Sequence, residues 1–174
     1  MKLKLFSLLL VVALLLCGCG PKTMEPSITT TVPATTQQTA MNIPDFVVFD
    51  SNADPHSLSE YVSKPIVLNF WGSWCGPCKS EMPGFQAVYE ELGDQVQFLM
   101  IDVGETTDEA EAFLAQAGYT FPVLFDVNGE ASYAYQISAV PATFFISAQG
   151  ELVDYHVGAM QEADLRAAVA QIQN

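Results

Sequence analysis

Apolar positions after residue 42 follow two spacings, one typical of strands and one typical of helices. Residues 66–71 form a nearly continuous apolar run, the pattern of a strand that is buried on both faces. Residues 75–92 then carry four large apolar side chains at helical spacing on one stripe, with Pro83 positioned to kink the helix. These side chains are Phe85, Val88, Tyr89 and Leu92. A buried strand followed by an amphipathic helix indicates an α/β fold.

The remaining pattern completes a mixed sheet. Short strands are expected at residues 46–49, 96–102, 119–125, 142–146 and 152–157, and helical segments at residues 57–61, 108–117 and 162–172. Gly118 is expected to end the helical segment before it. The sequence Ala148-Gln149-Gly150 predicts a three-residue hairpin loop, with glycine at the position that needs a left-handed backbone. The predicted fold class is α/β, a thioredoxin-like arrangement in which a central mixed β-sheet is flanked by helices on both faces.

The first residues have the pattern of an export signal. Lys2 and Lys4 precede an apolar run of about 12 residues, whereas a membrane span needs roughly 20. The Gly18-Cys19 junction resembles the lipobox of bacterial lipoproteins, in which a small residue precedes the cysteine that is lipidated; Cys17 follows a bulky leucine and fits less well. An ordinary secretory signal is the alternative, but no small-x-small site free of cysteine lies nearby. We therefore expect lipidation at Cys19.

A change in composition separates this leader from the folded domain. Residues 20–40 are rich in threonine, proline and glutamine and show no apolar periodicity. Such a segment buries too little apolar surface to offset the entropy of ordering it, so it is expected to be a flexible tether. The expected organisation is a signal peptide at 1–18, a tether at 19–41 and one domain at 42–174, held outside the cytoplasmic membrane by its lipid.

Charge excludes one class of function. The chain has 174 residues, 50% of them hydrophobic, which suffices for one compact core. Its 20 acidic and 6 basic residues give a net charge of -14, and loss of Lys2 and Lys4 with the leader would leave four basic residues. Such a surface repels nucleic-acid phosphates and anionic head groups. We expect no nucleic-acid partner and a monomeric domain whose acidity serves solubility.

The candidate chemistry lies in Trp74-Cys75-Gly76-Pro77-Cys78, which follows the predicted central strand and begins a helix. Unpaired N–H groups and the dipole at a helix N-terminus favour a thiolate and lower a cysteine pKa from about 8.5 toward roughly 7. Cys75 is therefore the predicted nucleophile. Cys78, one turn further on, is the predicted resolving thiol. The redox-active disulfide between them would serve in place of a cofactor.

Two structural roles for this cysteine pair are less well supported. A zinc site needs four ligands, and the only other soft ligands after the leader are His56 and His156, which are isolated in sequence and expected at the surface. We therefore expect no metal. A static disulfide would close a loop of only a few residues and would remove little chain entropy.

Several segments resemble one protein family. Residues 69–79, with the sequence Asn-Phe-Trp-Gly-Ser-Trp-Cys-Gly-Pro-Cys-Lys, resemble the active-site stretch of the thioredoxin superfamily. Glu81-Met82-Pro83 and residues 101–105, 121–123 and 140–146 resemble the membrane-anchored TlpA/ResA-type reductases, and the likeness covers nearly all of residues 43–174. It implies a reductase of disulfides in exported proteins, such as apocytochrome c, that a membrane thiol electron donor keeps reduced.

The resemblance also implies roles for individual residues. Pro141 matches a cis proline that lies opposite the cysteines, where the backbone of Val140 can pair with an extended substrate. Trp74, Gly76 and Pro77 would complete the substrate-binding surface.

Acid–base chemistry is expected to rest on Glu81. Asn69 stands where thioredoxin has a buried aspartate, and an amide does not titrate near neutral pH, while Glu81 matches an acid of the anchored reductases. Cys78 and Glu81 lie about 60° apart around the helix axis, so they share a face. The alternative is that Glu81 is a solvated residue that pairs with a neighbour.

Other functions stay open at this point. The Gly76-Pro77 dipeptide is that of thioredoxin, whose potential is about -270 mV, against about -120 mV for the oxidant DsbA, and this favours a reductase. The alternatives are a disulfide oxidase or isomerase, an electron donor to an exported methionine sulfoxide reductase, and a non-catalytic binding module. A peroxidase is disfavoured, because no peroxidatic cysteine stands apart from the pair.

Overall fold

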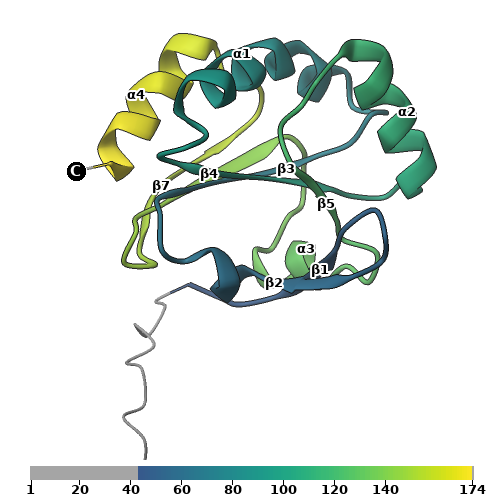
Figure 1. The fold of residues 1–174 in the computed structure, drawn as a ribbon, viewed down its shortest axis with the longest axis horizontal. Helices are drawn as coiled ribbons and strands as arrows, with labels where there is room; N and C mark the ends of the chain where they lie inside the picture. Colours follow the sequence, from purple (N-terminus) through teal and green to yellow (C-terminus); the bar gives the residue numbers. More distant parts are fainter. Residues whose placement is uncertain (1–42, 174) are drawn as a thin grey trace, which may run out of the picture. The chain divides into compact units, whose positions relative to one another are not determined.

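A central strand, β3 (Ile66–Trp71), organises a seven-stranded mixed sheet in the order β2-β1-β5-β4-β3-β6-β7 (Figure 1). The computed structural model describes residues 43–173, so the predicted signal peptide, Cys19 and the tether lie outside the described residues. The other strands are β1 (Val47–Phe49), β2 (Pro55–Ser57), β4 (Gln97–Asp102), β5 (Val123–Phe125), β6 (Ala142–Ile146) and β7 (Leu152–Val157). The helices are η1 (Leu58–Tyr61), α1 (Gly76–Leu92), α2 (Thr107–Ala117), α3 (Glu130–Ala134) and α4 (Glu162–Ile172).

The β3 strand is buried along its whole length, as its apolar run predicts, because other strands flank it and side chains cover both of its faces. It pairs in parallel with β4 and antiparallel with β6, and elements cover both of its faces. The parallel register sets Trp71 beside Asp102 at the carboxyl ends of the two strands. Loops that leave these ends are close in space, which is where open α/β sheets place their functional sites.

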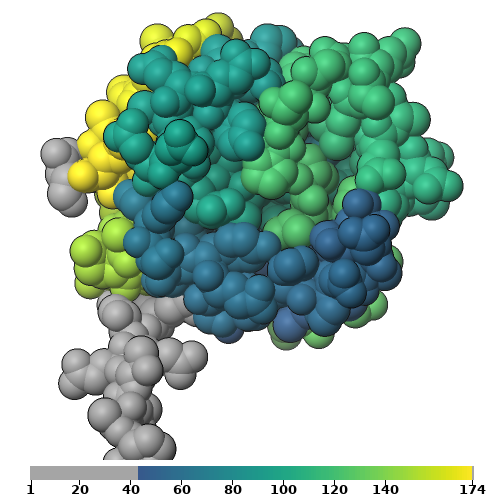
Figure 2. Space-filling view, viewed as in Figure 1, coloured from purple at the N-terminus to yellow at the C-terminus, as the bar shows by residue number. Residues whose placement is uncertain are grey.

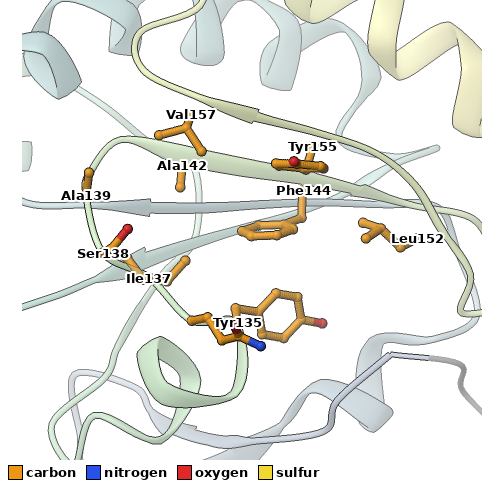
Figure 3. Close-up of a pocket in the computed structure, with 10 residues that line it drawn as sticks. Tyr135, Ile137, Ser138, Ala139, Ala142, Phe144, Leu152, Tyr155 and Val157 are labelled. Carbon is orange, nitrogen blue, oxygen red and sulfur yellow. The ribbon is translucent and has the colours of Figure 1, made fainter.

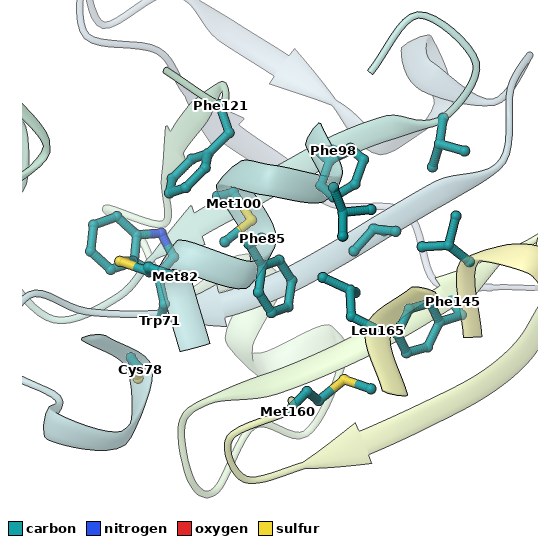
Figure 4. Close-up of a cluster of buried hydrophobic side chains, with 14 of the residues drawn as sticks. Trp71, Cys78, Met82, Phe85, Phe98, Met100, Phe121, Phe145, Met160 and Leu165 are labelled. Atoms are coloured by element: carbon teal, nitrogen blue, oxygen red, sulfur yellow. The ribbon is translucent and has the colours of Figure 1, made fainter. Parts of the chain in front are cut away.

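The alternation of side chains along β3 divides the core into two layers. Val67 and Trp71 face α1 and α4, in a cluster with Phe85 and Leu165 (Figure 4). Ile66, Leu68 and Phe70 face the opposite layer, which contains β1, η1 and α3. Figure 1 shows α1, α2 and α4 on one side of the sheet and α3 on the other. The predicted α/β fold, with a mixed sheet between helices, is confirmed.

The two short elements that the sequence does not predict are β2 and α3. The α3 helix spans five residues, too few to show an apolar stripe, and its first turn is held by Asp126, which accepts the N–H groups of Ala131 and Ser132. The strand expected at residues 119–125 is confined to β5, because Pro122 has no N–H to donate to a ladder. The bounds of β6, β7 and α4 agree with those predicted.

The last strand leaves part of one sheet face open. All six residues of the edge strand β7 are exposed, and Tyr155 stacks on Phe144 of β6 with 6.0 Å between ring centroids. A hollow of about 230 Å³ lies between this face and residues 135–139 (Figure 3). Figure 2 shows the segment with β1 and β2, in blue, along the lower part of the visible face. Within residues 43–173, no helix is both long and apolar enough to cross a membrane.

Candidate active site

The cysteine pair occupies the start of α1, where the sequence places it. Cys75 is the N-cap of α1 and Cys78 lies in the first turn, and the two form a disulfide. Pro77 also lies in this first turn, where a missing N–H leaves no helical bond unmade. The N–H of Cys78 donates to Sγ of Cys75 at 3.1 Å. A helix N-terminus thus points a donor at the sulfur on which a thiolate would form.

The two cysteines differ slightly in exposure. Cys75 is 5% exposed, whereas Cys78 is completely buried and belongs to the hydrophobic cluster between β3 and α1. Cys78 therefore offers no surface to a partner disulfide, and Cys75 is the more exposed cysteine of the pair. This difference agrees with the predicted roles, because the nucleophile must be reached by the substrate and the resolving thiol need not be.

A tight turn presents Cys75 to the helix. The N–H of Cys75 donates to the carbonyl of Gly72 at 3.1 Å, and the indole of Trp74 folds back over the turn, where it donates to the carbonyl of Val103 at 3.1 Å. A Cβ on Gly72 would stand 2.4 Å from Nε1 of this indole, so any larger residue there would displace the indole. Trp74 remains 58% exposed and offers an apolar surface beside the disulfide.

The loop before β6 lies against the reactive sulfur. The Val140–Pro141 peptide bond is cis, as the resemblance implies, and the carbonyl oxygen of Val140 is 3.6 Å from Sγ of Cys75. The structure thus brings Val140 and Pro141 together with Cys75 across 65 residues of sequence. The hollow beside β7 borders this loop but includes neither cysteine, so it is not the reactive centre.

Glu81 lies inside the protein, one turn of α1 beyond Cys78. It is 3% exposed, its Oε1 accepts from the side-chain amide of Asn69 at 3.0 Å, and its Oε2 accepts the N–H of Met160 at 2.8 Å. Burial raises the pKa of Glu81 to about 7, although both of these hydrogen bonds favour the ionised form. Glu81 is therefore not a solvated helix residue, and its pKa lies in the range of a general base at neutral pH.

Among the described residues, neither of the two histidines forms a hydrogen bond or an ion pair with the cysteine pair. His56 lies near Asp50 and Glu60, with its Nδ1 3.4 Å from the Glu60 carboxylate, and His156 is exposed on β7. Within residues 43–173, no group of three or more histidine, cysteine, aspartate or glutamate side chains is arranged to hold a metal ion.

Sequence reasoning assigned residues 101–105 to the family resemblance but gave the segment after β4 no role in the site. Glu105 accepts hydrogen bonds from both the N–H and the hydroxyl of Ser73, two residues before Cys75. The available signal was topological, because β3 and β4 are consecutive parallel strands and their carboxyl ends meet. The acidic residue that follows β4 was therefore placed to reach the turn that follows β3.

The chain matches known proteins in both sequence and fold. Residues 39–155 match the model of the AhpC/TSA family. The chain is 36% identical over 143 residues to the thiol-disulfide oxidoreductase ResA of Geobacillus kaustophilus strain HTA426, a match that covers 79% of this chain and 82% of that protein.

Solved structures give the same fold. A thiol:disulfide interchange protein DsbE from Chlorobium tepidum is 26% identical with a TM-score of 0.70, and the match covers 77% of this chain and 96% of that one. The exposed lipoprotein thioredoxin Etrx1 of Streptococcus pneumoniae strain TIGR4 is 27% identical with a TM-score of 0.61, and the match covers 74% of this chain and 99% of that one.

Proposed function

Because the chain belongs to the AhpC/TSA family of thioredoxin-like proteins and is a thiol-disulfide oxidoreductase, we propose that it works outside the cytoplasmic membrane as a reductase of disulfides in exported proteins. The observation that carries the proposal is the asymmetry of the pair at the start of α1. Cys75 is the more accessible sulfur and accepts the N–H of Cys78, whereas Cys78 is buried with Glu81 one turn beyond it.

The reaction begins at Cys75. Its thiolate attacks one sulfur of the substrate disulfide, a bond forms between the two sulfurs, and the other substrate sulfur leaves as a thiolate that takes up a proton from water. The N–H of Cys78 stabilises the Cys75 thiolate before the attack. The product is a mixed disulfide between Cys75 and the substrate.

The second step forms the enzyme disulfide. Ionised Glu81 accepts the proton of the Cys78 thiol, either directly or through water, and the Cys78 thiolate attacks Sγ of Cys75. The substrate leaves with its second sulfur reduced, and the Cys75–Cys78 disulfide retains the oxidising equivalents. The substrate gains two electrons in all. A thiol donor at the membrane returns them to the pair for the next cycle.

The substrate is proposed to be an extended segment of an exported protein, for which apocytochrome c is one example. Val140 and Pro141 flank Cys75 on one side, and Trp74, Gly76 and Pro77 form the surface on the other. A backbone that lies along Val140 would bring its disulfide to Sγ of Cys75, in the manner of strand addition. The hollow beside β7 adjoins this path through residues 137–139.

Location follows from the lipid anchor proposed at Cys19. The Gly18-Cys19 junction, the short apolar leader and the threonine-rich segment after it support an anchored domain. A structurally similar protein of Streptococcus pneumoniae is itself described as an exposed lipoprotein.

The reduction potential of the Cys75–Cys78 pair tests the proposed direction of electron flow. We expect equilibration of the full chain with glutathione or with a thioredoxin of known potential to give a value close to about -270 mV. A value near the roughly -120 mV of DsbA would instead identify a disulfide oxidase and would overturn the reductase proposal.

A further inference from the structure

Residues 103–105, which we name the clasp, bind the turn that carries Cys75. The clasp directly follows β4, and the N–H of Val103 donates to the carbonyl of Trp71 at 2.9 Å. The carbonyl of Val103 in turn accepts the indole N–H of Trp74. Gly104 has a φ of 80°, a conformation that glycine adopts without strain, and it turns the chain so that the next residue faces back toward the turn.

Glu105 is the one charged group of the clasp. One of its carboxylate oxygens accepts the backbone N–H of Ser73, and the other accepts the Ser73 hydroxyl. Ser73 is the second residue of the turn that the N–H of Cys75 closes on Gly72, so its own N–H has no acceptor inside that turn. The bonds to Glu105 therefore fix the backbone two residues before the reactive sulfur.

Asp102, the residue before the clasp, is buried. It ends β4, is 2% exposed, and its Oδ2 has no hydrogen-bond donor among the described residues. An ionised carboxylate in this position would be both unpaired and next to the charge of Glu105. A protonated Asp102 would instead be a donor, and a hydrogen bond with Glu105 is one of the causes that raise the pKa of Asp102.

Three further acidic side chains line the hollow beside Asp102. The hollow that it lines, of about 580 Å³, is also lined by Glu105 of the clasp, Glu109 of α2 and Asp126 after β5, and by no lysine, arginine or histidine. Burial first, then the hydrogen bond and charge of Glu105 and the charge of Glu109, raise the pKa of Asp102 to about 9. Asp102 is therefore protonated at neutral pH.

We propose that Glu105 is a positioning residue for the sulfur of Cys75, and that Asp102 donates a hydrogen bond that holds the Glu105 carboxylate against Ser73. The carboxylate acts through the backbone, because it holds the turn that keeps Sγ of Cys75 on the helix N–H of Cys78. The role concerns formation of the Cys75 thiolate itself. It therefore stands whether the pair reduces or oxidises its substrate and wherever the protein is located.

The test is the pH dependence of Cys75 alkylation by iodoacetamide in the reduced full chain. We expect Glu105→Ala to slow alkylation at neutral pH roughly threefold to tenfold and to move the pH profile of alkylation to higher pH. This is the effect expected from the loss of about one hydrogen bond. Ser73→Ala should slow it less and add nothing in the Glu105→Ala background, because both changes break the same contact.

Two further variants separate position from charge and from fold. Glu105→Gln keeps an acceptor for the Ser73 N–H, so it should restore a profile close to that of the parent, and Glu111→Gln on the exposed face of α2 removes a charge without touching the clasp. The proposal is overturned if Glu105→Ala lowers only the melting temperature, if the Ser73 and Glu105 effects multiply, or if Glu105→Gln and Glu105→Ala accelerate alkylation alike.

The part played by Asp102 has its own pair of variants. Asp102→Asn keeps a donor toward Glu105 and should retain the parent profile, whereas Asp102→Leu removes the donor and should reproduce the slow alkylation of Glu105→Ala. Thermal melts of the reduced proteins establish that each is folded, and the Glu105 variants decide the matter if Asp102→Leu is not. A folded Asp102→Leu protein with a parent-like profile would refute the support that we assign to Asp102.

Discussion

The side-chain amide of Asn69 on β3 donates to Oε1 of Glu81 on α1 at 3.0 Å. The same nitrogen donates to the hydroxyl of Thr143 on the neighbouring strand at 2.9 Å. A carboxylate at position 69 could donate to neither group, and it would add a second negative charge next to Glu81. Asparagine therefore allows Glu81 to occupy the interior behind Cys78. In this site the titratable group therefore lies on the helix α1 and not on the strand β3.

Glu81→Gln tests whether this carboxylate removes the Cys78 proton. Because a base must be ionised and the pKa of Glu81 is about 7, turnover of the parent should rise as the pH increases through about 7. The variant keeps an acceptor for the N–H of Met160, so it should fold, but turnover should fall by roughly a hundredfold and lose this rise.

Reduction of a protein disulfide across about pH 5 to 9 provides the measurement for the Glu81 prediction. Alkylation of Cys75 over the same range separates the ionisation of the attacking thiol from that of Glu81. Parent-like turnover at every pH would mean that water alone carries the Cys78 proton.

The order of attack is tested by trapping. Cys78→Ser leaves the accessible sulfur of Cys75 with no thiol to resolve it, so a mixed disulfide with a substrate should accumulate. Cys75→Ser leaves only the buried sulfur and should trap almost nothing. Mass spectrometry of the complexes gives the ratio, and equal trapping by the two variants would contradict the roles proposed from burial and from the position of the helix N-terminus.

Gly72→Ala should disturb the turn without touching either cysteine. The new methyl group would stand 2.4 Å from Nε1 of Trp74, so the indole must move and its bond to Val103 is lost. We expect a loss of about 1–3 kcal/mol in the free energy of unfolding and stronger quenching of tryptophan fluorescence by acrylamide.

Gly76→Ala is the matched control for stability, because a Cβ at Gly76 meets no atom within 4 Å. Equal stability of the two variants would show that the indole of Trp74 is not packed on Gly72 as described.

The β3 strand and the α1 helix were predictable because their local sequence patterns agree with their tertiary surroundings. The apolar run of β3 marks a strand covered on both faces, and α1 begins at Gly76 directly after Cys75, as the placement of the motif requires. The cis proline and its place opposite Cys75 came from resemblance to a family, because a sequence alone gives no contact between residues 65 positions apart.

Other features depend on tertiary contacts that no local pattern encodes. The N–H of Met160 reaches Glu81 only because α4 packs beside α1, and these two residues are 79 positions apart. Asp102 ends a strand and has the pattern of a polar residue that leaves the core, yet the clasp and α2 bury it. Its raised pKa could be recognised only after its burial was known and Glu105 and Glu109 were placed around it.

The lipid anchor is tested at Cys19. The Gly18-Cys19 junction predicts that Cys19→Ser abolishes lipidation and releases the protein from the membrane fraction. Mass spectrometry of the mature protein detects the diacylglyceryl group, and Cys17→Ser is the matched control, which should remain lipidated. A diacylglyceryl group on the Cys19→Ser protein would place the anchor elsewhere.

The pH dependence of stability follows from the two buried carboxyl groups. The pKa of Asp102 is raised from 3.8 to about 9, so between these values the folded protein holds a proton that the unfolded chain has lost. The contribution of Asp102 to the free energy of unfolding therefore falls as the pH rises from about 4 to about 9. Glu81, with a pKa raised from 4.5 to about 7, adds to this fall only up to about pH 7.

Asp102→Asn should remove the part of this dependence that lies above about pH 7, because the amide does not titrate and Glu81 is already ionised there. Urea denaturation of the oxidised protein at pH 5, 7 and 9 gives the free energies. We expect the parent to lose stability between pH 7 and 9, the exposed-surface variant Glu111→Gln to lose as much, and Asp102→Asn to lose clearly less. Parallel curves for Asp102→Asn and the parent above pH 7 would show that Asp102 is already ionised in the folded protein at neutral pH, and that another group holds the Glu105 carboxylate.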